Sequence, residues 1–134
     1  SRYFKRRKEL YSLLNMNDFA HRRIANLSSG MKQKVSIART IIHDPSVVVF
    51  DEPTTGLDVL SSRAIVKLIL RCREEGKTVI FSSHRMAEVE NLCDDIAILH
   101  KGEIFFNDTF ESFKGQMRSS TLEEEFIRLT VGSS

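Results

Sequence analysis

Apolar positions along the chain alternate between helical and extended spacing, which predicts a mixed α/β protein. Residues 3–15 combine apolar side chains with many cations and predict a basic helix. One apolar stripe predicts a second helix, which opens with Ser28-Ser29-Gly30 and ends before Pro45. The run 47–50 is β-branched and aromatic without alternation, which is typical of a strand covered on both faces in a parallel sheet.

Turn residues separate the later elements. Gly76 marks the end of a third helix, and Lys101-Gly102 lies between two short apolar runs as in a β-hairpin. Thr121 and Glu124 have the spacing of a capping box, which predicts a last helix through Leu129. The remaining predicted elements are a helix over 60–72, a buried strand over 78–81, a helix over 86–93, strands over 96–99 and 104–106, and a frayed end at 132–134.

The order of helices and strands is that of doubly wound α/β proteins, in which ligands bind at the carboxyl ends of parallel strands. Asp51, Glu52 and His84 all fall at such positions. Four phenylalanines in the predicted hairpin and the segment after it favour core packing, with a stacking platform for nucleic-acid bases as the alternative. They are Phe105, Phe106, Phe110 and Phe113.

Composition narrows the class of protein. Of the 134 residues, 41% are hydrophobic and 28% charged, which supplies a core and excludes a disordered chain. The formal net charge of +2 is too small for a protein that binds its partners only by neutralising phosphate groups. The two cysteines form neither a disulfide framework nor a zinc cluster, and no apolar run is long enough to span a bilayer. We therefore expect a cytosolic chain.

Two acids after the first strand are the first candidates for chemistry. Asp51 could hold Mg²⁺, because carboxylate oxygens suit this hard cation and a strand-end Asp has this role in P-loop NTPases. Glu52 could accept a proton from an attacking water. The dipeptide alone is equally compatible with a helix cap or a turn.

Ser28-Ser29-Gly30 is the second candidate. Free backbone N–H groups, two hydroxyls and the helix dipole would favour an anion such as phosphate at this helix start. Serine is also a preferred helix cap without any ligand, so the segment alone leaves both interpretations open.

The order and separation of the pieces carry a resemblance to ATP-binding cassette (ABC) ATPases. Leu27-Ser28-Ser29-Gly30-Met31 resembles their signature loop, and 47–52 with Pro53 resembles their Walker B strand. Gly56-Leu57-Asp58 is similar to their D-loop, and His84 to their switch histidine. The resemblance spans most of residues 20–107. It implies a partial P-loop NTPase-type parallel sheet with flanking helices, whose N-terminal part comes from a helical subdomain.

The resemblance implies a site shared by two nucleotide-binding domains, with ATP and Mg²⁺ as cofactors. Asp51 would serve Mg²⁺, Glu52 would be the catalytic base, and His84 would contact the γ-phosphate and the attacking water. Ser28, Ser29 and Gly30 would bind the γ-phosphate of ATP held by the partner domain. Asp58 would couple the two sites across their interface.

The chain departs from the family pattern in two ways. Ser29 and Met31 stand where the family usually has Gly and Gln, and no G-x-x-x-x-G-K-[ST] segment occurs. The resemblance therefore implies the C-terminal portion of an ABC ATPase domain, inactive alone and with apolar sheet edges that favour self-association. Its expected parts are a helical subdomain with the signature helix (1–44), a Walker B, D-loop and switch-histidine core (45–107) and a helical tail (108–134).

The function implied is that of the energy-coupling ATPase subunit of a membrane transporter, with an exporter favoured by the Ser-Ser-Gly-Met-Lys-Gln and Thr-Thr-Gly-Leu-Asp segments. Its expected partners are a transmembrane permease and a second nucleotide-binding domain, identical or different, without direct nucleic-acid binding. It would be cytoplasmic and peripheral on the inner face of the membrane. The alternatives are an ABC-type ATPase acting on nucleic acid or ribosomes, and a nonenzymatic dimerisation module.

Overall fold

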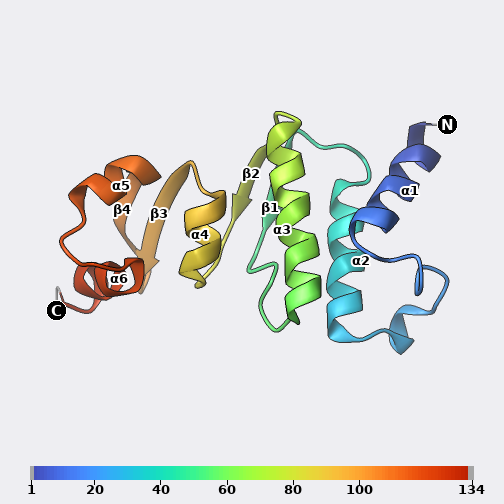
Figure 1. The fold of residues 1–134 in the computed structure, drawn as a ribbon, viewed down its shortest axis with the longest axis horizontal. Helices are drawn as coiled ribbons and strands as arrows, with labels where there is room; N and C mark the ends of the chain where they lie inside the picture. Colours follow the sequence, from blue (N-terminus) through green and yellow to red (C-terminus); the bar gives the residue numbers. More distant parts are fainter. Residues whose placement is uncertain (1, 133–134) are drawn as a thin grey trace. The chain divides into compact units, whose positions relative to one another are not determined.

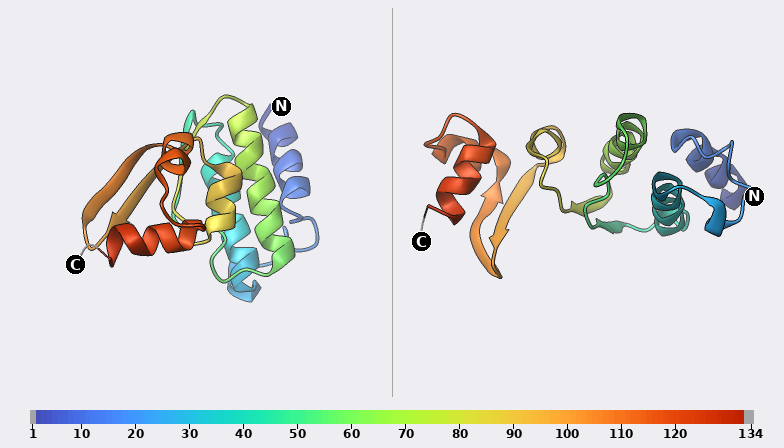
Figure 2. Two further views of the ribbon diagram at one scale, coloured as in Figure 1. Left: turned by 60° about the vertical axis from the view of Figure 1, so that its left-hand side comes forward. Right: turned by 90° about the horizontal axis from the view of Figure 1, so that it is seen from below.

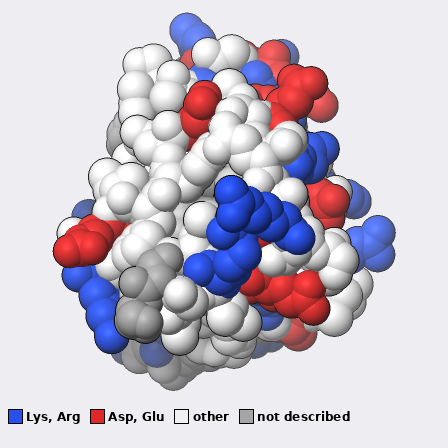
Figure 3. Space-filling view, turned by 90° about the vertical axis from the view of Figure 1, so that its left-hand side faces the viewer, with Lys and Arg blue, Asp and Glu red and all other residues white. Residues whose placement is uncertain are grey.

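The chain forms two compact units, residues 1–84 and 85–134, in a computed structural model that describes residues 2–132 (Figure 1). The mixed α/β class with a parallel sheet and flanking helices is confirmed. Of the expected frayed end at 132–134, residues 133–134 lie outside the described residues, whereas the backbone N–H of Gly132 donates to the carbonyl of Ile127 at 2.9 Å. On the face drawn in Figure 3, basic and acidic side chains lie among uncharged ones.

Among its described residues, the first unit has three α-helices and one short 3₁₀ helix beside its sheet. The expected helices are present, whereas the 3₁₀ turn lies in a polar stretch whose spacing predicted no element. Gly76 has a φ of +79° and follows the last helical turn of the third helix, as the sequence predicts. The bounds are α1 (Arg2–Leu13), η1 (Ile24–Asn26), α2 (Ser29–Ile41) and α3 (Val59–Glu74).

The sheet of the first unit consists of β1 (Val47–Phe50) and β2 (Thr78–Phe81). The two strands are parallel, and Phe50 is paired with Phe81 at their carboxyl ends. α3 lies along one face of the pair, as Figure 2 shows, and Val48 and Phe50 are buried on β1. This β1-α3-β2 motif therefore brings the residues that follow both strands to the same edge of the sheet.

The expectation that β1 and β2 are covered on both faces is wrong. Val47, Val49 and Ile80 are 54%, 63% and 56% exposed. The burial along β1 alternates because, among the described residues of this unit, the helices cover a single face of a two-stranded sheet. A β-branched run without alternation thus identified the strand correctly but not its surroundings.

This apolar face should make the chain self-associate as its concentration rises, because isolated proteins rarely expose contiguous apolar surface. Val49→Lys should weaken the association by placing a charge in the middle of the face. Sedimentation velocity over a concentration series measures the effect, with Ser36→Lys on the exposed side of α2 as the control for added charge. A wild-type chain that stays monomeric throughout would contradict the expectation.

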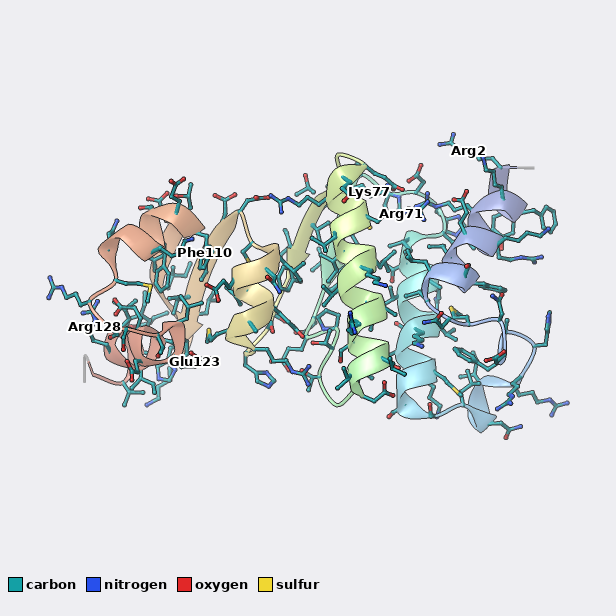
Figure 4. The ribbon with its side chains drawn as sticks, viewed as in Figure 1. Arg2, Arg71, Lys77, Phe110, Glu123 and Arg128 are labelled. Atoms are coloured by element: carbon teal, nitrogen blue, oxygen red, sulfur yellow. The ribbon has the colours of Figure 1, made fainter. Side chains whose placement is uncertain are left out.

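Asp44 holds the amino ends of the two strands together. It precedes Pro45 with a φ of +57°, and its carboxylate pairs with Arg2, Arg6 and Lys77. Figure 4 shows Arg2 and Lys77 at the same end of the first unit. The hydrogen bond from Lys77 is the main cause that lowers the pKa of Asp44. These ion pairs hold the amino ends of β1 and β2 together. The candidate residues after Phe50 and Phe81 lie at the opposite, carboxyl ends.

The part of the second unit that the structure describes is an antiparallel hairpin with three helices. Lys101 and Gly102 have φ values of +48° and +79°, which fit the predicted two-residue turn. The predicted β-hairpin is confirmed, because the strand over 96–99 pairs antiparallel with the next one. The bounds are α4 (Met86–Leu92), β3 (Asp95–His100), β4 (Glu103–Thr109), α5 (Phe110–Gln116) and α6 (Leu122–Thr130).

The phenylalanines of this unit pack in its core, as the first of the two interpretations predicted. Phe110 and Phe113 are buried with Val89 and Ile98, and Phe105 and Phe106 pack against them. Of the two hydrogen bonds that make a capping box, the structure shows one at the start of α6. The Thr121 hydroxyl accepts from the backbone N–H of Glu124 at 3.2 Å, whereas the Glu124 carboxylate accepts from the Ser120 hydroxyl.

Candidate functional site

Four polar residues meet where β1 and β2 end. Asp51 and Glu52 directly follow β1, and Ser82 and His84 follow β2. The parallel ladder continues one step past the strands, because the backbone N–H of Ser82 donates to the carbonyl of Phe50 at 3.0 Å. The predicted trio of Asp51, Glu52 and His84 is therefore brought together within the first unit.

Hydrogen bonds connect these side chains. The Ser82 hydroxyl donates to Asp51 Oδ1 at 2.7 Å and accepts from the backbone N–H of Glu52 at 2.8 Å. Glu52 Oε1 lies 3.1 Å from His84 Nδ1, and the Thr55 hydroxyl donates to Glu52 Oε2 at 3.3 Å. These contacts therefore orient the carboxylates of Asp51 and Glu52.

Glu52 has a backbone conformation that is uncommon for a residue with a side chain. Its φ of +43° lies in the left-handed region. Side chains held in such conformations concentrate at functional sites, where the surrounding structure must enforce them. The side chains of Glu52 and His84 are 44% and 64% exposed, so a ligand in solution could reach both.

Gln33 on α2 supports the chain just after Glu52. Its amide Nε2 donates to the carbonyl of Pro53 at 3.1 Å. The α2 helix is thereby tied to the turn that follows the two acids, although Gln33 is eighteen positions before Asp51 in the sequence.

Ser28, Ser29 and Gly30 begin α2. The Ser28 hydroxyl accepts from the backbone N–H of Met31 at 3.2 Å and is the N-cap, while Ser29 is the first helical residue. Ser29 is not among the described residues with positive φ, so its Cβ causes no backbone strain there. A Cβ added at Gly30 would lie 3.6 Å from Leu57 Cδ2, at ordinary contact distance. The signature-like segment therefore lies beside the D-loop-like segment.

Asp58 is the N-cap of α3. Its Oδ1 accepts from the backbone N–H of Ser61 at 2.8 Å, and this bond is the main cause that lowers its pKa. The charge of Lys34, a buried residue of α2, lowers the pKa further. Asp58 therefore carries a stable negative charge at the junction of α2 and α3.

Sequence reasoning missed four residues of this region, namely Ser82, Thr55, Gln33 and Lys34. One signal could have found Ser82, because a hydroxyl directly after the second strand must lie opposite the acids after the first. The contacts of Gln33 and Lys34 depend on how α2 packs, which the chain's local pattern does not specify.

The arrangement can bind a cation and move a proton. No group of three or more His, Cys, Asp or Glu side chains that could hold a metal occurs in the part of the chain that the structure describes. Mg²⁺ nevertheless fits, since it is commonly held by one or two carboxylates together with substrate phosphates and waters. Asp51 is the suitable carboxylate, and the Glu52–His84 pair beside it can accept and hold a proton.

Comparison with known proteins identifies the family. The sequence model of the ABC transporter family matches residues 2–55. The ABC transporter ATP-binding protein NatA of Bacillus subtilis is 43% identical over 124 residues, which are 92% of this chain and 50% of that protein. The chain belongs to the ABC transporter ATP-binding proteins.

Other ABC relatives agree with this assignment. The linearmycin resistance ATP-binding protein LnrL of Bacillus subtilis is 35% identical over 95% of this chain and 40% of its own length. A solved structure of the ATP-binding subunit of an ABC transporter covers 96% of this chain and 54% of its own, with a TM-score of 0.85 and 29% identity. The chain spans about half the length of these ABC proteins. Within the described residues, no helix has both the length and the apolar character required to cross a membrane.

Proposed function

We propose that these residues form the second half of an ATP-hydrolysing domain that drives an ABC transporter. The observation that carries the proposal is the meeting of Asp51, Glu52 and His84 at the carboxyl ends of two parallel strands. Phosphoryl transfer to water requires mainly the positioning of the reactants and the stabilisation of charge. Asp51, which could bind the cation, and Glu52, which could accept the proton, would together meet both requirements.

Each residue has a separate task in this proposal. Asp51 would hold Mg²⁺, which neutralises charge on the phosphates when it is bound. Glu52 would accept the proton of the attacking water, in a direction set by its contacts with His84 and Thr55. His84 would contact the water and the γ-phosphate from its exposed ring.

The second group of residues would face a nucleotide on another domain. Ser28, Ser29 and Gly30 present a capped helix start with free backbone N–H groups, which suits a γ-phosphate. Asp58 lies next to this segment through Leu57 and Ser61, so it could relay the state of one site to the other. A second nucleotide-binding domain, identical or different, is the partner that this arrangement requires.

We further propose a transmembrane permease as partner, peripheral attachment to the membrane through it, and export as the direction of transport. The Ser-Ser-Gly-Met-Lys-Gln and Thr-Thr-Gly-Leu-Asp segments support export. The 134 residues contain no G-x-x-x-x-G-K-[ST] segment, and we propose that they neither bind nucleotide tightly nor hydrolyse it by themselves.

The proposal can be tested in a full-length ATP-binding subunit that contains these residues, assembled with its permease in vesicles. Turnover should depend on Mg²⁺, and Asp51→Asn should lower it at least about tenfold while raising the Mg²⁺ concentration needed, because a carboxylate ligand is lost. Asp18→Asn on the exposed surface is the control. Calorimetry on the 134-residue chain should show no stoichiometric Mg-ATP binding.

Two results would contradict the proposal. Unchanged turnover and Mg²⁺ dependence in Asp51→Asn would remove this residue from the site. Turnover stimulated by DNA or ribosomes, with no response to the permease, would favour the other kind of ABC ATPase.

A further inference from the structure

Ser82 hydrogen-bonds to both acids of the candidate site, to the carboxylate of Asp51 and to the backbone N–H of Glu52. It follows β2 directly, and its backbone N–H donates to the carbonyl of Phe50, one residue before Asp51. This bond sets its side chain opposite the start of the turn that contains Asp51 and Glu52. Ser82 is thus placed by the sheet itself rather than by a flexible loop.

A serine hydroxyl has a single proton to donate, and at Ser82 that proton and a lone pair are both engaged. The hydroxyl donates to Asp51 Oδ1 at 2.7 Å and accepts from the backbone N–H of Glu52 at 2.8 Å. The first bond is charge-assisted and orients the carboxylate. The second satisfies the N–H of the residue whose φ is +43°.

The left-handed conformation of Glu52 determines where its carboxylate lies. In this conformation the carboxylate reaches His84 Nδ1 at 3.1 Å and the Thr55 hydroxyl at 3.3 Å. Such a conformation persists only when neighbouring groups enforce it. The Ser82 hydroxyl accepts from the backbone N–H of Glu52, and the backbone N–H of Thr55 donates to the Glu52 carbonyl at 3.2 Å. Of these two neighbours, Ser82 is the one that also binds Asp51.

We propose that Ser82 is a positioning residue of the ATPase site, which acts by fixing the Asp51 carboxylate and the Glu52 backbone with one hydroxyl. The inference rests on the proposed function and adds a residue to it. Ser82 does not take part in the chemistry. It sets the distance and direction between the acid for the cation and the acid for the proton.

The test compares three variants at position 82 in the full-length subunit. Ser82→Ala removes both bonds and should lower kcat by about tenfold to a hundredfold, the range expected for a hydrogen bond to a charged group. Ser82→Thr keeps the hydroxyl and should restore most of the activity. Cysteine is nearly isosteric with serine, but its thiol forms only weak hydrogen bonds, so Ser82→Cys should behave like Ser82→Ala. Because Ser82→Cys keeps the size of the side chain, agreement between the two variants would show that the loss does not come from a disturbed fold.

A binding measurement separates positioning from a general loss of structure. Titrating Mg²⁺ into each variant with a non-hydrolysable ATP analogue should show a several-fold higher Mg²⁺ requirement for Ser82→Ala and Ser82→Cys, with nearly unchanged affinity at saturating Mg²⁺. Ser36→Ala, an exposed serine on α2, should match the wild type.

The outcomes distinguish this inference from the proposed function. If Glu52→Gln leaves turnover intact, the proposed function fails whatever position 82 shows. If Glu52→Gln abolishes turnover but Ser82→Ala and Ser82→Cys both keep wild-type kcat and Mg²⁺ requirement, the role of Ser82 alone is overturned. A Ser82→Thr variant as impaired as Ser82→Ala would also overturn it, because the hydroxyl would not be the active feature.

Discussion

Replacing Glu52 by glutamine should lower ATP turnover about 10²–10⁴-fold, the usual contribution of a general base, in a full-length subunit that contains this chain. Glutamine is nearly isosteric and can still bind the Thr55 hydroxyl and face His84. It cannot accept the proton of the attacking water. Nucleotide binding should therefore persist while the chemical step stops.

Steady-state hydrolysis and equilibrium binding of Mg-ATP, measured on the same protein, check this result. Glu74→Gln is a suitable control, because Glu74 is an exposed residue at the end of α3, away from the carboxyl ends of the strands. Equal losses of binding and turnover in Glu52→Gln would indicate a structural role for this acid. Normal turnover would exclude it as the base.

The second large effect concerns the stability of the second unit. The side chain of Glu125 is 2% exposed, and its carboxylate accepts from the backbone N–H groups of Arg118 and Ser119 at 3.2 and 2.9 Å and from Arg128. Glu125→Ala should cost about 1.5–3 kcal/mol, because the backbone N–H groups of Arg118 and Ser119 lose their charged acceptor. Amide hydrogen exchange in α6 and at residues 118–119 measures the loss.

Glu123→Ala is the matched control, since Glu123 lies on the same helix but is exposed, and both Glu123 and Arg128 are marked in Figure 4. Equal exchange rates in Glu125→Ala and Glu123→Ala would contradict the assignment of Glu125 as the anchor of α6.

Acid should have the same effect as the Glu125→Ala substitution. The hydrogen bonds from Arg128 are the main cause that lowers the pKa of Glu125 to about 2, from an ordinary value of 4.5. Because the folded state holds the carboxylate ionised, its contribution to stability is complete above pH 4.5 and is lost as the pH falls toward 2. Protection of the α6 amides should decline over that range in the wild type but not in Glu125→Ala.

Much of this architecture was predictable because local signals agree with the final structure. The strand 47–50, the stop at Gly76 and the Lys101-Gly102 turn depend on β-branched runs and on residues that tolerate positive φ, which are properties of short segments. Asp51, Glu52 and His84 could be placed at one edge because parallel strands share their carboxyl ends.

What the sequence did not predict depends on packing between distant segments. The exposure of Val49 follows from how many layers cover the sheet, which the β-branched run itself does not specify. Ser82 escaped notice because its importance lies in two bonds to residues thirty positions away, which require the register of β1 and β2. At this edge of the sheet the sequence singled out the two acids and the imidazole, and it missed the neutral hydroxyl of Ser82, which hydrogen-bonds to both acids.

In our proposal, the acids after β1 and the imidazole after β2 form the hydrolytic end of an ATP site. The most direct test is a crystal structure of the full-length subunit with Mg²⁺ and a non-hydrolysable ATP analogue. We expect Asp51 to face the magnesium ion, with Glu52 and His84 directed at the γ-phosphate. A nucleotide bound with its γ-phosphate away from these three side chains would contradict the account.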